Sequence, residues 1–121
     1  MTPAPKSSPA ISVINLEAGR PSVQQALSQL ERALADVKRQ GRTLLKLIHG
    51  YGSSGMGGDI RIAVQKRLHE LKCDGKLRAV IFGEEWARSN AEAWELLSSE
   101  PTLKNDADLG RRNRGITIVQ L

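Results

Sequence analysis

The feature that most constrains the fold is a strand, loop and helix pattern in the middle of the chain. Residues 43–49 form a nearly continuous apolar run, which is typical of a strand buried on both faces. Five glycines follow within positions 50–58, and then apolar residues recur at positions 60, 64, 68 and 71, as on one face of a helix. A buried strand joined to an amphipathic helix predicts a layered α/β domain.

The rest of the chain supplies the other elements of such a domain. Residues 11–17, 77–82 and 115–121 predict three more strands. Ser22 and Gln25 form a capping box, and the apolar spacing after them predicts a helix to about Arg39, with Gly41 as its cap. We therefore expect a single α/β domain over residues 11–121, with one mixed four-stranded sheet and helices packed on it.

An acidic insert separates the last two predicted strands. Residues 83–114 are too long for a bare loop, and Ser89 or Asn90 can cap a short helix that Pro101 ends. Trp86 and Trp94 lie in this insert, where we expect them to anchor it to the core rather than to form a partner-binding patch. An alternative is that the insert lies across the basic face as a lid.

The remaining composition indicates the cellular setting. Residues 1–10, with three prolines, predict a disordered tail. No apolar run approaches the roughly 18 residues of a membrane span, and the N-terminus lacks a secretory signal. Cys73 is the only cysteine, which excludes an internal disulfide or a cysteine-based zinc site. We expect a cytoplasmic protein that does not associate with a membrane.

Charge is segregated along the chain. Residues 38–78 hold ten bases and three acids, residues 83–108 hold seven acids and two bases, and three arginines follow at positions 111, 112 and 114. The net charge of +5 favours an anionic partner, of which nucleic acid is the most common. Since the chain has only four aromatic residues, base stacking cannot be its main binding mode.

The glycine segment permits three interpretations. The first is a nucleotide-binding loop. The segment satisfies G-x-G-x-x-G, but no acidic residue follows at the distance that a dinucleotide site requires. A Walker loop needs Lys and Ser or Thr after Gly58, where Asp59 and Ile60 stand. The second interpretation is a connection between strand and helix in which the glycines only allow tight backbone geometry. The third, which we favour, is that loop amides at the start of a helix hold a phosphate of a nucleic acid.

This interpretation predicts a set of binding residues. They are the loop residues together with basic residues expected to flank the loop. The predicted nucleic-acid-binding residues are Gly50, Tyr51, Gly52, Ser53, Ser54, Gly55, Gly57, Gly58, Arg61, Lys72, Arg111, Arg112 and Arg114.

Two segments resemble a known family. The run His49-Gly50-Tyr51-Gly52-Ser53-Ser54-Gly55, followed by Gly58-Asp59-Ile60-Arg61, resembles the H-G-x-G-x-G signature of the Smr (small MutS-related) domain. Residues 115–121 are similar to its closing G-x-T-x-V-x-L strand. The resemblance implies a two-layer βαβαββ sandwich, with residues 83–114 as an extra helical insert before the last strand, and binding of nucleic acid. It also implies a slight preference for RNA over DNA as the bound nucleic acid, and association with the ribosome.

The resemblance leaves open whether the protein is an enzyme. Several Smr domains nick DNA or cleave RNA, and active members carry Asp-x-His where this chain has Asn15-Leu16-Glu17. An endonuclease that uses Glu17 and His49, without a cofactor or with Mg²⁺ held by Glu17, is therefore an alternative. We expect no site of histidine and cysteine ligands for a transition metal. The third alternative is a protein-interaction module that uses the acidic insert, with a purely structural glycine loop.

Overall fold

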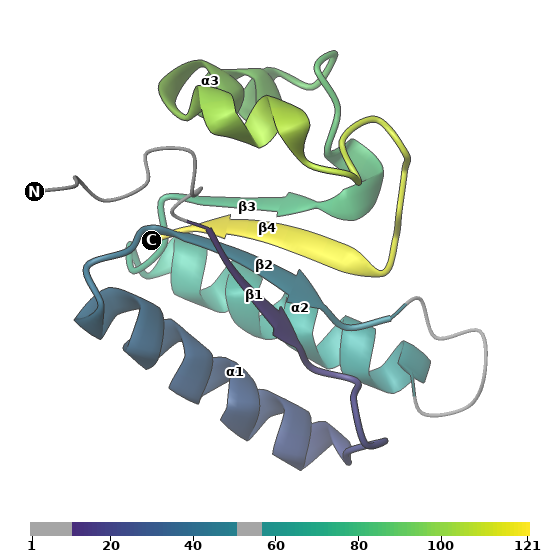
Figure 1. Ribbon diagram of the computed structural model, residues 1–121. Helices are drawn as coiled ribbons and strands as arrows, with labels where there is room; N and C mark the ends of the chain where they lie inside the picture. Colours follow the sequence, from purple (N-terminus) through teal and green to yellow (C-terminus); the bar gives the residue numbers. More distant parts are fainter. Residues whose placement is uncertain (1–10, 51–56) are drawn as a thin grey trace, which may run out of the picture.

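Residues 11–50 and 57–121 are described in a computed structural model, which is built on one four-stranded sheet (Figure 1). Its strands are β1 (Ile11–Asn15), β2 (Leu44–Ile48), β3 (Ala79–Phe82) and β4 (Ile116–Gln120), in the order β1-β2-β4-β3. β1 is parallel to β2, and β4 is antiparallel to both β2 and β3. The carboxyl ends of β1, β2 and β3 therefore lie at the same edge as the beginning of β4.

Helices α1 (Val23–Arg39) and α2 (Gly57–Cys73) cover one face of this sheet (Figure 1). Ser22 caps α1, and the reciprocal bond from Gln25 completes the predicted capping box. The C-cap is Gln40, one residue before the predicted Gly41. The apolar residues at positions 60, 64, 68 and 71 are buried, as their spacing predicted, and they pack with α1, β2 and β4.

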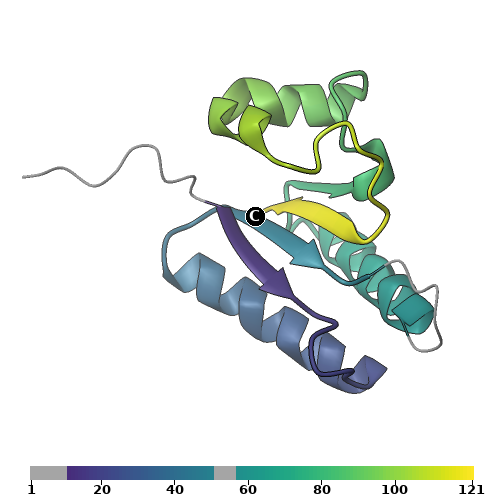
Figure 2. The same ribbon diagram turned by 45° about the vertical axis from the view of Figure 1, so that its right-hand side comes forward.

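The insert covers the other face of the sheet and adds a third layer there. It contains the short 3₁₀ helix η1 (Gly83–Glu85), the helix α3 (Ala91–Ser99) and a second 3₁₀ helix, η2 (Pro101–Asn105). Figures 1 and 2 both show α3 on the side of the sheet away from α1 and α2. The insert and this face of the sheet enclose a second hydrophobic core. Trp86 is fully buried in this second core and anchors the insert as predicted, whereas Trp94 is 51% exposed.

Carboxylates of the insert neutralise a lysine in the centre of the sheet. Lys46 in β2 is 8% exposed, and its Nζ lies 2.9 Å from Oδ1 of Asp106 and also pairs with Asp108. Nε1 of Trp86 donates to the other oxygen of Asp106 at 3.0 Å. Burial alone would lower the pKa of Lys46, but the hydrogen bonds to Asp108 and Asp106 raise it overall. These acids therefore hold the insert onto the sheet, and they do not form a lid over the carboxyl ends of the strands.

The structure confirms the predicted α/β class and the mixed four-stranded sheet. The predicted tail, residues 1–10, lies outside the described residues. Within the described part of the chain, no helix combines the length and apolar character that a membrane span requires.

The hydrogen bonds around Lys46 predict that two acids of the insert, removed one at a time, differ in how much their loss destabilises the protein. Asp106→Ala should lower the free energy of unfolding by about 2–3 kcal/mol, because it removes acceptors from both a buried ammonium and Trp86. Glu92→Ala removes only the half-exposed ion pair with Lys72 and should cost less than about 1 kcal/mol. Urea unfolding followed by tryptophan fluorescence measures both. Equal costs would contradict the assigned role of Asp106.

Candidate nucleic-acid interface

The candidate site lies at the edge of the sheet where β1, β2 and β3 end and β4 begins. Its backbone junction is the carbonyl of Gly115, which accepts from the N–H of His49 at 2.9 Å and from that of Gly50 at 3.1 Å. These bonds place the turn before β4 directly beside the end of β2. We call this region the carboxyl edge; it comprises residues 15–20, 49–50, 57–61, 83–85 and 111–115.

His49 is buried completely beneath this junction. Its Nδ1 lies 3.0 Å from the carbonyl oxygen of Gly50 and must donate, since a carbonyl only accepts. Nε2 is therefore unprotonated and accepts from the hydroxyl of Thr117 at 2.8 Å. With both nitrogens bonded inside the protein, His49 fixes the end of β2 against β4 and is not placed to exchange a proton with a ligand.

The environment of His49 also keeps its ring neutral. Burial is the main cause that lowers its pKa below the ordinary value, and the positive charge of Arg61 lowers the pKa further. The carbonyl of Gly50 and the carboxylates of Glu17 and Glu84 act in the opposite direction, but burial prevails. These interactions also show that Glu17, Arg61 and Glu84 all lie around the same histidine.

Glu17 packs against Gly50 at the end of β1. Gly50 has a φ of +78°, which favours glycine, and a Cβ on it would lie 2.4 Å from Oε1 of Glu17, so the Glu17 side chain would have to move. Oδ1 of Asn15 accepts from the backbone N–H of Glu17 at 2.9 Å, which fixes the direction of the chain there. The structure thus brings Glu17 beside Gly50 and His49, but it leaves the histidine ring committed to Thr117.

The arginine turn, residues 111–114, is held at the carboxyl edge by its neighbours. Oδ1 of Asn113 accepts from the N–H of Gly115 at 2.8 Å, and the amide nitrogen of Asn113 donates to Asp108 at 2.9 Å. Gly83 lies so close that a Cβ on it would be 1.7 Å from the carbonyl oxygen of Asn113. This packing places the turn that carries Arg111, Arg112 and Arg114 at the carboxyl edge.

The predicted binding residues divide into three groups. Gly50, Arg61 and the three arginines lie at the carboxyl edge, where Gly57 and Gly58 begin α2. Tyr51, Gly52, Ser53, Ser54 and Gly55 lie outside the described residues. Lys72 is the exception: it lies eleven residues beyond Arg61, about 16 Å along α2, and its Nζ pairs with Glu92 at 2.7 Å. Helical spacing predicts that Lys72 and Arg61 share one flank of α2, but the length of the helix separates them.

Sequence reasoning missed three residues that build the carboxyl edge. Thr117 holds His49, Asn113 shapes the arginine turn, and Gly83 gives that turn room. Thr117 is the threonine of the closing G-x-T-x-V-x-L segment, and that position was the available signal for it. Across residues 11–50 and 57–121, no group of three or more His, Cys, Asp or Glu side chains is arranged to hold a metal ion.

Comparison with known proteins identifies the fold. The sequence matches no family model and no curated protein. The crystal structure of the Smr domain of Thermus thermophilus MutS2 is similar to this chain with a TM-score of 0.56 and 20% sequence identity. The match covers 91% of this chain and 96% of that domain. The chain thus has the Smr fold, which confirms the expectation drawn from the glycine motif and the closing strand.

The buried, neutral His49 predicts a specific dependence of stability on pH. Because its pKa in the folded protein is below the unfolded value of about 6.5, the unfolded state binds the proton more readily. The stabilisation is complete above that value and is lost as the pH falls towards the folded pKa. Unfolding in urea from about pH 7.5 to about pH 5.5 should show this loss.

Two variants show which histidine causes this pH dependence of stability. His69→Gln, at an exposed histidine, should keep the pH dependence, whereas His49→Asn should weaken it. NMR titration of the His49 ring in the unmodified protein gives a direct check if His49→Asn does not fold. A His49 that titrates at or above about 6.5 would contradict the account.

Proposed function

We propose that this protein binds nucleic acid through the carboxyl edge, gripping the phosphate backbone. The observation that carries the proposal is the Gly115 junction. It joins the end of β2 to the arginine turn, at the edge where Arg61 and the beginning of α2 also lie. Arginines bind phosphate through paired N–H groups, and a helix N-terminus offers unpaired amides, so the two complement each other at one surface.

The distribution of the other charges supports this choice of surface. Lys46 and Lys72, which belong to the basic central block of the sequence, form ion pairs with Asp106, Asp108 and Glu92 of the insert. The carboxyl edge brings Arg61 and the arginine turn together, and we propose that they meet the external anion there. Glu17 and Glu84 lie at the same edge and limit how closely a phosphate approaches there.

The two tryptophans are not placed to stack bases at the carboxyl edge. Trp86 is buried in the second core, and the exposed Trp94 is on α3, on the opposite side of the sheet from α1 and α2. Bases stacking on aromatic side chains would need such residues near the phosphate contacts. RNA is the nucleic acid we propose, and the ribosome, which presents dense RNA phosphates, is a partner consistent with it.

Removal of two arginines tests the proposal. Arg61→Ala combined with Arg112→Ala should weaken binding of labelled RNA and should reduce the slope of log affinity against log salt by about 1.4, which corresponds to two phosphate contacts. The matched control is Arg67→Ala, because Arg67 pairs with Glu31 on the helix layer, away from the arginine turn. Unchanged affinity and slope in the double variant would refute phosphate binding at this edge.

Endonuclease activity is the second candidate, favoured by the exposed Glu17 beside Gly50. The engaged ring of His49 argues against it, because neither nitrogen is available as an acid or a base. We therefore expect salt-sensitive binding without cleavage when RNA or supercoiled plasmid is incubated with the protein, with or without Mg²⁺. Cleavage that disappears in Glu17→Gln would support the enzyme instead, and Glu17→Asp would show whether the position of the carboxylate matters.

A further inference from the structure

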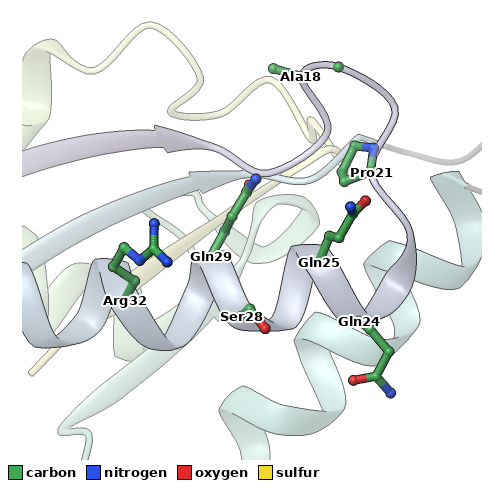
Figure 3. Close-up of a pocket in the computed structure, with 8 residues that line it drawn as sticks. Ala18, Pro21, Gln24, Gln25, Ser28, Gln29 and Arg32 are labelled. Carbon is green, nitrogen blue, oxygen red and sulfur yellow. The ribbon is translucent and has the colours of Figure 1, made fainter.

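A polar hollow of about 500 Å³ lies beside the first half of α1. The turn between β1 and α1 forms one wall, and exposed side chains of the helix form the other. Figure 3 shows Gln25, Gln29 and Arg32 extending from α1 towards the side where Ala18 and Pro21 lie, whereas Gln24 points the other way. The lining residues are Ala18, Gly19, Pro21, Gln24, Gln25, Ser28, Gln29 and Arg32.

The chemistry of this lining differs from that of the carboxyl edge. It contains three glutamines, one serine and one arginine, and no acid. Each glutamine amide and the serine hydroxyl can both donate and accept a hydrogen bond. The Oε1 of Gln25 already accepts from the N–H of Ser22 at 2.8 Å, which holds that side chain in place. No salt bridge engages Arg32 within the described parts of the chain.

The hollow is continuous with the carboxyl edge along the chain. Ala18 and Gly19, which line it, directly follow Glu17, and the carboxylate of Glu17 contacts Gly50. Between Glu17 and Leu30 the only charged residue is Arg20, in the connecting turn. A strand whose phosphates contact the arginine turn can therefore extend over the β1–α1 turn and onto α1 without meeting another acid in this segment.

We propose that this hollow receives the ribose of a bound RNA strand and selects RNA over DNA through the 2′-hydroxyl group. That hydroxyl both donates and accepts, which matches neutral amides and a hydroxyl better than it matches cations. Arg32 then faces a neighbouring phosphate, about 10 Å along the helix from Gln25. The inference rests on the proposed function, because it adds a contact that distinguishes two nucleic acids at the same surface.

The test compares the binding of two ligands to the unmodified protein and to one double variant. Oligouridylate and oligodeoxyuridylate of about 12 nucleotides differ only at the 2′ position, and fluorescence anisotropy measures the affinity of each. The unmodified protein should bind the RNA more tightly. Ser28→Ala combined with Gln29→Leu should weaken RNA binding about tenfold and leave DNA binding unchanged, since it removes two neutral hydrogen-bonding groups. Circular dichroism confirms that the variant is folded; the exposed positions and helix-forming replacements favour this.

The controls separate this inference from the proposed function. Gln40→Ala changes an exposed glutamine outside the hollow and should preserve the preference for RNA. Arg61→Ala should weaken RNA and DNA alike. If the unmodified protein binds both ligands equally, or if the double variant weakens both or neither, the hollow does not select ribose, although nucleic-acid binding stands. If the unmodified protein binds neither ligand, the proposed function and the inference are both refuted.

Discussion

The carboxyl edge depends on one carbonyl oxygen, that of Gly115. It accepts the N–H groups of both His49 and Gly50, so the strand that closes the sheet is tied to the strand that leads into the glycine segment. The ring of His49 repeats this connection two residues further along β4, through its bond to Thr117. Because both connections are buried, they hold the arginine turn and the end of β2 in a single arrangement.

The acidic insert forms ion pairs with two lysines of the basic central block. Its aspartates pair with Lys46 in the middle of the sheet, and its Glu92 pairs with Lys72 at the far end of α2. The insert therefore covers an apolar face of the sheet and at the same time neutralises part of the basic central block. The charge segregation seen in the sequence is therefore in part a set of internal contacts.

Local signals made most of the fold predictable from the sequence. The capping box of Ser22 and Gln25 marks the start of α1, and the continuous apolar run of β2 reflects burial on both faces. Both depend on residues close together in the chain. The position of the insert was not predictable, because Asp106 bonds both to Lys46 and to Trp86, each of which is far from it in the sequence.

The candidate site was predictable in its residue types but less so in its geometry. The glycine segment and the arginines indicated phosphate binding, yet spacing along α2 could not show that Lys72 and Arg61 serve opposite ends of the sheet. In the same way, a histidine before a glycine loop is compatible with catalysis or with a structural bond. Only the position of Thr117 on a neighbouring strand decides in favour of the structural bond.

The central claim is that the carboxyl edge is the surface that meets nucleic acid. Its most direct test is a titration of isotopically labelled protein with a short single-stranded RNA, followed by NMR of the backbone amides. The account predicts that the largest shifts occur at Gly50, at the beginning of α2 and in residues 111–115. Shifts centred on α3 and the exposed Trp94 would contradict it, because they would place the interface on the insert.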